Sequence, residues 1–293
     1  MRHLVGATHG HETGWVAVPG GRQLMQRIAS GLDVVTCISD YTRGRLAPAL
    51  GGRTRLAQLS PGVDVERFTP DADGAAVRER YGLGAAPVVV CVSRLVARKG
   101  QDVLVAGWPR VLARHPDARL LLVGAGPAEA ALRRSVAARG LTGSVVFTGP
   151  VDPAELPGHY AAGDVFAMPC RTRRAGLDVE GLGMVFLEAA ACARPVVAGT
   201  SGGAPETVRE GVTGHVVDPR SPAAVAEILG DLLADPDRAH AMGAAGRRWV
   251  EERWSWTHIA AAFAELLEPP PLGTEPRPAR GGSGLSGRVF QRA

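Results

Sequence analysis

Short apolar runs alternate with amphipathic stretches along most of the chain after residue 86. Between the runs, apolar residues recur at the three- and four-residue spacing of a helix, as at Leu104, Trp108 and Val111. This alternation is typical of a parallel sheet whose strands are joined by helices. The expected strands are residues 87–92, 119–123, 144–148, 164–168, 195–198 and 214–217, and the expected helices include residues 101–115, 128–139 and 222–234.

We therefore expect an α/β protein in which residues 87–246 form a doubly wound, Rossmann-like domain. Residues 1–63 precede it and contain a helix-like stretch over residues 22–29, an apolar strand over residues 33–38 and a helix that Ser39 can cap. Because these elements continue the same βα order, they look like the last units of a second Rossmann-like domain.

Three segments do not follow this alternation of strands and helices. Residues 64–86 begin with acidic side chains and a proline, and we expect them to link the two domains. Residues 247–268 are rich in tryptophan and are expected to form closing helices that pack toward the first domain. Residues 269–293 are rich in Pro, Gly and Arg, which predicts a flexible basic tail.

Composition excludes several classes of protein. The net charge is +4 at pH 7 and only 5% of the residues are aromatic, whereas a nucleic-acid-binding face needs a basic stripe with aromatic side chains, so we expect no nucleic-acid partner. The four cysteines form no C-x2-C pair, which favours a reducing cytoplasm. Because the chain shows neither a signal peptide nor a run of about 18 apolar residues, any membrane contact is expected to be peripheral.

Lysine use is the most informative feature of the composition. Of the 33 basic residues, only Lys99 is a lysine. A chain that uses arginine wherever a positive charge suffices is expected to keep lysine where a compact ammonium is needed. The alternative is that Lys99 is a chance survivor on a solvated surface.

Unusual residues gather in the loops after the expected strands, where open parallel sheets bind their ligands. After the first strand, Arg94 and Lys99 can converge on one anion, and an Arg fork with a Lys ammonium suits a diphosphate leaving group. After the third strand, backbone groups of Val151 and Asp152 can meet the edge of a base, although a structural turn is an equal alternative. The G-x-G of residues 124–126 is better explained by a tight turn.

Two glutamates flank an expected helix start in the loop after the fourth strand. If the helix begins near Gly183, its free N–H groups form an anion site. Glu180 would then hold sugar hydroxyls beside that site, and Glu188 would accept the hydroxyls of a ribose. The alternatives are a helix-dipole acid at Glu180 and a solvated residue at Glu188, the second disfavoured by the apolar residues around it.

Two further features have open alternatives. The loop of residues 199–206 either contacts phosphate or the opposite domain, or is a plain turn into a helix. His9 and His11 lie in a loop of the first domain, where His9 can hydrogen-bond a sugar hydroxyl and His11 can equally be a core histidine. With His3 they provide no recognised metal-ligand spacing, so we expect no metal and no cofactor.

Together, S-R-x4-K-G, E-x7-E, G-G-x-P-E and a closing W-S-W helix resemble the retaining GT-B glycosyltransferases of the nucleotide-sugar type. More narrowly, residues 8–12, 168–173, 175–183 and 202–207 are similar to the actinobacterial mannosyltransferases of phosphatidylinositol mannoside synthesis that act at the inositol 6-position. The resemblance covers residues 1 to about 268. It implies transfer of mannose from GDP-mannose to a phosphatidylinositol mannoside acceptor, with retention of configuration, in the cytoplasm at the inner face of the plasma membrane.

The resemblance also implies roles for individual residues. Arg94 and Lys99 would bind the donor diphosphate, Glu188 the ribose and His9 the mannose. The guanine would meet Val151 and Asp152. The mannose and its phosphate would meet Glu180 together with the backbone of Gly181, Leu182, Gly183, Met184 and Val185. The implied catalytic residues are His9, Glu180, Arg94 and Lys99, without a covalent nucleophile.

Two other functions stay open on the sequence alone: a related GT-B transferase with another nucleotide sugar or a soluble acceptor, and an inactive nucleotide-sugar-binding fragment. The second arises because GT-B enzymes have two domains of similar size, whereas residues 1–63 are a short first domain. The sequence therefore predicts the back part of a longer protein, which binds the donor but transfers little mannose.

Overall fold

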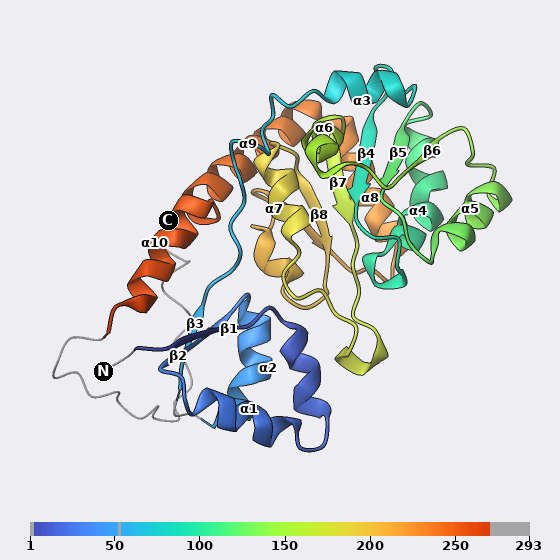
Figure 1. Ribbon diagram of the computed structural model, residues 1–293. Helices are drawn as coiled ribbons and strands as arrows, with labels where there is room; N and C mark the ends of the chain where they lie inside the picture. The colour runs from blue at the N-terminus through green and yellow to red at the C-terminus, as the bar shows by residue number, and fades with distance from the viewer. Residues whose placement is uncertain (1–2, 52–53, 270–293) are drawn as a thin grey trace. The chain divides into compact units, whose positions relative to one another are not determined.

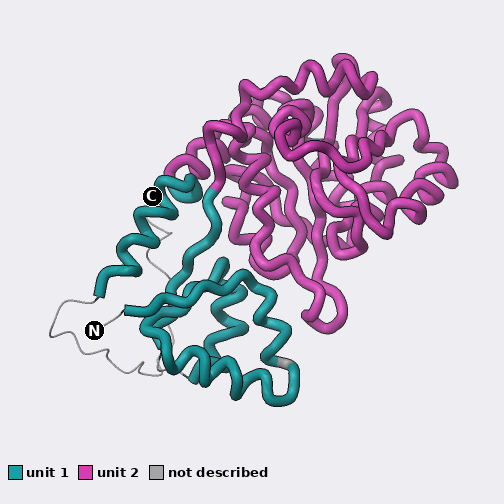
Figure 2. The backbone as a smooth tube through the Cα atoms, viewed as in Figure 1, with its two compact units in different colours: residues 1–62, 253–293 teal, residues 63–252 magenta. Residues whose placement is uncertain are grey.

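The computed structural model describes residues 3–51 and 54–269, so the expected tail lies, after its first residue, outside the described part of the chain. The chain divides into two compact units (Figure 2). Unit 1 comprises residues 1–62 and 253–293, and unit 2 comprises residues 63–252.

Unit 2 is built on a six-stranded sheet in the order β6-β5-β4-β7-β8-β9, with every neighbouring pair parallel (Figure 1). The strands are β4 (Val88–Val92), β5 (Arg119–Val123), β6 (Val145–Gly149), β7 (Val165–Met168), β8 (Val196–Gly199) and β9 (Gly214–Val217). The six predicted strands form, and their ends differ from the prediction by no more than one residue. The strand order reverses between β4 and β7, which is where sheets of this kind bind ligands.

Helices connect β4 to β5, β5 to β6, β6 to β7 and β7 to β8, as expected for a doubly wound domain, and the other helices of this unit precede β4 or follow β9. The helices are α3 (Gly74–Arg80), α4 (Gln101–Arg114), α5 (Glu129–Ala138), α6 (Leu156–Ala161), α7 (Met184–Ala191), α8 (Pro222–Ala234) and α9 (Pro236–Arg253), with 3-10 turns η2 (Ala97–Lys99), η3 (Pro153–Glu155), η4 (Arg174–Gly176) and η5 (Ala204–Thr207). Strand β4 is buried along its whole length, and Trp108 and Phe186 are fully buried on the helices that cover the sheet. The predicted α/β class is confirmed.

Residues 64–86, which we expected to act as a linker, are packed into unit 2. Phe68 and Val77 are buried there, and α3 lies against α6. The guanidinium of Arg247 on α9 donates a hydrogen bond to the carbonyl of Phe68 at 2.6 Å. The sequence prediction relied on the acidic and Gly-containing composition of the segment. The few buried apolar residues, Phe68 and Val77, are its apolar anchors and give it a defined structure.

Unit 1 holds a three-stranded parallel sheet, β1 (Val5–Ala7), β2 (Val34–Cys37) and β3 (Arg55–Gln58), in the order β1-β2-β3. Its helices are α1 (Gly21–Ala29), α2 (Asp40–Leu50) and α10 (Trp256–Leu267), with the 3-10 segment η1 (His11–Ala17). Ser39 caps α2 as predicted, because its hydroxyl accepts the N–H of Thr42 at 3.1 Å. Residues 247–268, the expected closing segment, are divided between the end of α9 and α10.

Candidate functional site

A hollow of about 320 Å³ opens at the carboxyl ends of β4, β5 and β6. Its lining is Val92, Ser93, Arg94, Val123, Gly124, Ala125, Pro150, Val151 and Leu156. Val151 therefore lies where a planar apolar group could enter, and its contact with a base stays a prediction. The carboxylate of Asp152 accepts the N–H of Ala154 at 2.8 Å and so caps η3.

The G-x-G after β5 is explained by close packing of two loops. A Cβ atom at Gly124 would lie 2.3 Å from the carbonyl oxygen of Ser93, and one at Gly126 would lie 2.4 Å from that of Leu95. Larger residues would separate the loops that line the hollow. These glycines shape the site without needing to contact a ligand.

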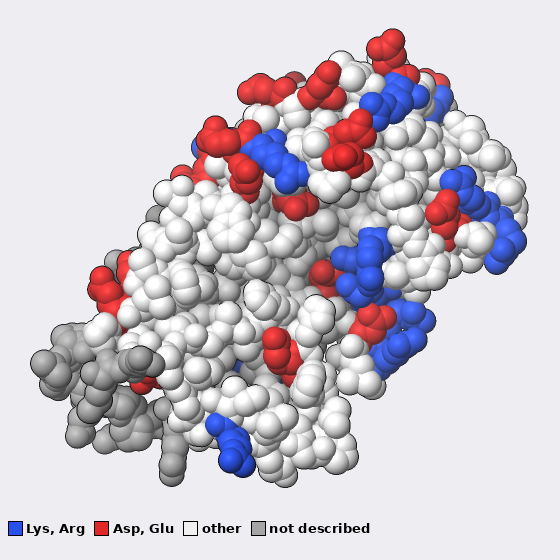
Figure 3. Space-filling model, in the orientation of Figure 1, with Lys and Arg blue, Asp and Glu red and all other residues white. Residues whose placement is uncertain are grey.

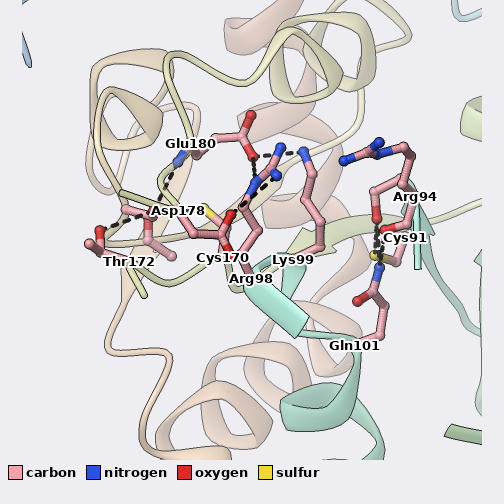
Figure 4. A network of polar contacts seen from close by, with 12 residues as sticks. Cys91, Arg94, Arg98, Lys99, Gln101, Cys170, Thr172, Asp178 and Glu180 are labelled. Atoms are coloured by element: carbon pink, nitrogen blue, oxygen red, sulfur yellow. Dashed lines mark hydrogen bonds and ion pairs between the residues drawn. The ribbon is translucent and has the colours of Figure 1, made fainter. Parts of the chain in front are cut away.

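Arg94 supplies a cation without a carboxylate partner in the described part of the chain. Its side chain is exposed and lines the hollow, and it takes part in none of the ion pairs found among residues 3–51 and 54–269. The side chain of Gln101 holds its loop by donating to the Arg94 carbonyl at 3.0 Å. In Figure 4 the Arg94 guanidinium points toward the ammonium of Lys99. Two cations that approach one region favour an anionic ligand between them.

Lys99 is buried and forms an ion pair with Glu180. Its Nζ lies 2.6 Å from Glu180 Oε2, and each side chain is 10% exposed. Arg98 extends the network (Figure 4): its Nε lies 3.8 Å from the same Glu180 oxygen, and a terminal nitrogen lies 3.4 Å from Asp178 Oδ1. The charges of Lys99 and Arg98 are balanced by those of Glu180 and Asp178. Arg94 therefore gives the whole cluster a net positive charge. The Lys99 ammonium has three N–H donors, and one contact with Glu180 leaves donors for an anion.

The loop after β8 holds Glu180 in place. The hydroxyl of Ser201 accepts the N–H of Glu180 at 3.1 Å, and the N–H of Gly203 donates to the Glu180 carbonyl at 3.1 Å. The predicted alternatives for residues 199–206 were contact with phosphate or the opposite domain, and a plain turn. The contacts add a third role, because this loop positions a candidate sugar-binding carboxylate.

Helix α7 starts where the sequence predicted. Met184 is its first residue, and Gly183 precedes it with φ of 96°. No side chain caps this end, so the first-turn amides and the positive end of the helix dipole can receive an anion. The structure thereby places a second positive feature beside the Glu180 segment, and the binding role of residues 181–185 stays a prediction.

Glu188 lies inside α7, where it is partly exposed and accepts a hydrogen bond. The Tyr160 hydroxyl on α6 donates to Glu188 Oε2 at 2.6 Å. Burial raises the pKa of Glu188, against the hydrogen bond from Tyr160 and the nearby positive charges of Arg67 and Lys99, which lower it. Burial also raises the pKa of Tyr160 well above its ordinary value, with the adjacent Glu188 adding to the effect, so Tyr160 keeps its proton and acts as the donor.

Several residues of this arrangement were given no role from the sequence, among them Arg67, Arg98, Tyr160 and Ser201. Arg98 directly precedes Lys99 and could have been included with it. Ser201 lies within a loop that the sequence did single out, but its contact with Glu180 spans 21 residues. Tyr160 and Arg67 lie outside every motif, so only the fold brings them to Glu188.

His9 lies in unit 1, in the loop after β1. Its side chain is exposed, and its backbone N–H donates to the Glu12 carboxylate at 3.1 and 3.2 Å. Its role toward a sugar stays a prediction.

The described residues contain no group of three or more His, Cys, Asp and Glu side chains that could hold a metal ion. Among the described helices, none combines the length and the apolar character needed to cross a bilayer. On the face shown in Figure 3, basic side chains are interspersed with acidic ones and form no continuous stripe.

The doubly wound parallel domain of unit 2 belongs to the GT-B class of glycosyltransferase folds, as solved structures show. The structure of Anabaena Alr3699/HepE in complex with UDP and glucose is 25% identical, covers 91% of this chain and 71% of its own, and has a TM-score of 0.77. Sucrose-phosphate synthase from Thermosynechococcus elongatus is 29% identical over 89% of this chain and 66% of its own, with a TM-score of 0.72.

The chain belongs to the family of glycosyl transferases group 1, whose pattern matches residues 86–235. A curated relative from Mycolicibacterium smegmatis, GDP-mannose-dependent alpha-(1-6)-phosphatidylinositol monomannoside mannosyltransferase, is 55% identical over 91% of this chain and 70% of its own. A Corynebacterium glutamicum relative, described as acting on the monoacylated form of that glycolipid, is 48% identical over 92% of this chain and 70% of its own. The resemblance seen in the sequence is confirmed.

Proposed function

We propose that this protein is a retaining mannosyltransferase that moves mannose from GDP-mannose to a phosphatidylinositol mannoside glycolipid. The observation that carries the proposal is that Arg94 and Lys99 follow β4, while the uncapped start of α7 and Glu188 follow β7, its neighbour in the sheet. Relatives that bear the name of this activity match about nine-tenths of the chain at 48 to 55% identity.

The donor is proposed to lie along this edge of unit 2. The guanine enters the hollow beside Val151, and the Glu188 carboxylate accepts the ribose hydroxyls. The diphosphate meets Arg94, Lys99 and the first amides of α7, while Glu180 accepts hydroxyls of the mannose. This order follows the strand ends from β6 across β4 to the loop before α7.

The chemistry proposed for this geometry is stabilisation of a leaving diphosphate. The bond between mannose C1 and the phosphate oxygen breaks, negative charge grows on that phosphate, and Arg94 and Lys99 offset it. The acceptor hydroxyl oxygen bonds to C1 on the same face, and its proton passes to the departing phosphate. No covalent bond to the protein is needed in this scheme.

Donor titration and a transfer assay together test the function. Calorimetry should show binding of GDP and GDP-mannose and much weaker binding of UDP and UDP-glucose. Incubation with labelled GDP-mannose and vesicles containing phosphatidylinositol monomannoside should yield the dimannoside. Preference for UDP would overturn the donor assignment, transfer to a soluble inositol phosphate instead would overturn the acceptor, and donor binding without transfer would favour a nucleotide-sugar-binding module.

Substitutions of the two glutamates should affect the binding of different ligands. Glu188→Gln is expected to weaken GDP and GDP-mannose alike by about tenfold or more, since a hydrogen bond to a charged group is worth about 1.5–3 kcal/mol. Glu180→Gln should weaken GDP-mannose but not GDP, because the mannose is absent from GDP. Calorimetry with both ligands measures this division, and equal losses of GDP affinity in the two variants would contradict it.

We also propose that unit 1 contacts an anionic membrane surface peripherally. Leu24 and Ile28 lie one turn apart on α1 and are 47% and 58% exposed, and Trp15 of the adjacent η1 is 56% exposed. Arg22 and Arg27 on the same helix add positive charge. An exposed apolar stripe with arginines is the pattern of a helix that lies in a lipid interface. The location at the inner face of the plasma membrane stays a prediction.

Vesicle sedimentation tests this contact. Wild-type protein should sediment with vesicles that contain phosphatidylinositol and less with neutral phosphatidylcholine vesicles. Leu24→Asp with Ile28→Asp should remove most of the bound fraction, whereas Val212→Asp, at a residue of unit 2 that is 44% exposed, should not. Unchanged sedimentation of the double variant would exclude α1 as the contact.

A further inference from the structure

We infer that Tyr160 is a positioning residue of the donor site, whose hydroxyl fixes the Glu188 carboxylate for the ribose. The inference rests on the proposed function, which assigns the ribose to Glu188. Neither the sequence motifs nor the names of the relatives assign a role to Tyr160.

The geometry leaves the Tyr160 hydroxyl little freedom. Its ring is fully buried, with the Phe68 ring at 5.8 Å in an edge contact and the Phe166 ring at 5.6 Å. The hydroxyl lies 2.6 Å from Glu188 Oε2, which is the length of a charge-assisted O–H···O⁻ bond. Because the ring is held on two sides, the hydroxyl holds one carboxylate oxygen and leaves the other to meet the ribose.

The groups around Glu188 act on its pKa in opposite directions, and the hydrogen bond from Tyr160 is one of those that lower it. Tyr160 on α6, Arg67 before α3 and Lys99 of η2 all favour the carboxylate, while burial disfavours it and raises the pKa of Glu188 overall. Cys192, at the end of α7, stays neutral because burial raises its pKa to about 12. A ribose hydroxyl donates to a carboxylate, so donor affinity should fall as the pH falls through the pKa of Glu188. Without the Tyr160 hydroxyl that pKa rises further, and the loss begins at a higher pH.

The test is the pH dependence of GDP-mannose binding in Tyr160→Phe. GDP-mannose is the suitable probe because its phosphates are both esterified, whereas a terminal phosphate ionises near pH 6. Relative to wild type, the variant is expected to lose about threefold in affinity at about pH 8.5, from the missing hydrogen bond alone, and to lose more at about pH 6. Phenylalanine keeps the ring contacts, and a cooperative unfolding transition in both proteins will check this, with the variant melting somewhat lower because the hydrogen bond to Glu188 is lost. Tyr81→Phe, at a tyrosine whose ring meets His159, is the matched control and should bind like wild type.

A ligand lacking the ribose hydroxyls separates positioning from packing. Tyr160→Phe should weaken GDP but not 2′,3′-dideoxy-GDP, and it should add little to Glu188→Gln in the double variant. An equal loss at both pH values, or for both ligands, would overturn the inference and leave Tyr160 with a packing role. Wild-type protein that binds GDP and its dideoxy form equally would refute the ribose role of Glu188, and wild-type protein that binds neither would refute the proposed function.

Discussion

Replacing Lys99 with alanine is expected to weaken GDP-mannose binding by at least about tenfold, the equivalent of one charged hydrogen bond. The same change should destabilise the protein, because Glu180 Oε2 lies 2.6 Å from Lys99 Nζ in a pair that is 10% exposed on each side. Removing one partner of a buried pair leaves an uncompensated charge, which costs up to about 3–5 kcal/mol. Arg98, at 3.8 Å from the same oxygen, reduces this penalty. We therefore expect a loss of about 2 kcal/mol, or about 4–8 °C in melting temperature.

A second substitution distinguishes the two effects. In Lys99→Ala with Glu180→Gln the buried charge is gone, so most of the melting temperature should return while GDP binding stays weak. Lys99→Arg should also fail to restore full donor affinity, because a planar guanidinium differs in shape and size from the ammonium that fits this buried position. Calorimetry and thermal unfolding measure the two effects separately. If all three variants bind GDP like wild type, Lys99 has no donor role.

The strands of unit 2 could be predicted because each one is an apolar run between helical stretches. Burial of β4 along its whole length demands such a run, and the sequence shows it directly. The start of α7 was predicted from the glycines that flank it, and Gly183 indeed adopts a backbone conformation that side chains disfavour. Lys99 was found for another reason: arginine replaces lysine everywhere else in the chain.

Contacts between distant segments could not be predicted in this way. The Tyr160 and Glu188 side chains meet across 28 residues, from two helices that follow different strands. Neither residue is unusual for its own helix, so the spacing of apolar residues in the sequence does not predict that the two side chains meet. The packing of residues 64–86 into unit 2 has a related cause: Phe68 is one of a few apolar anchors in this segment, and its contacts come from Tyr160 and Arg247. Pairings of this kind depend on the tertiary fold and have no local signal.

The loop that supports Glu180 should be unusually sensitive to one added methyl group. Gly202 has φ of +57°, and a Cβ atom there would lie 1.9 Å from the Glu180 carbonyl oxygen. Gly202→Ala must therefore displace the Glu180 segment, together with the hydrogen bonds that Ser201 and Gly203 make to it at 3.1 Å. Overpacking costs about 1–3 kcal/mol, and the left-handed backbone adds about 1–2 kcal/mol for a residue with a Cβ atom. A total near 3 kcal/mol corresponds to a melting temperature lower by about 6–12 °C.

Gly211 offers a matched control for this substitution in the same unit. Its φ is +70°, but a Cβ atom there meets nothing within 4 Å. Gly211→Ala should therefore show only the backbone cost and leave donor binding unchanged. Gly202→Ala should in addition lose GDP-mannose affinity by about tenfold or more, since a displaced Glu180 loses a charged hydrogen bond to the mannose worth about 1.5–3 kcal/mol. Thermal unfolding and calorimetry on both variants compare the two glycines directly. If Gly202→Ala and Gly211→Ala have equal melting temperatures and equal donor affinities, the loop after β8 accommodates the added methyl group without cost and does not position Glu180.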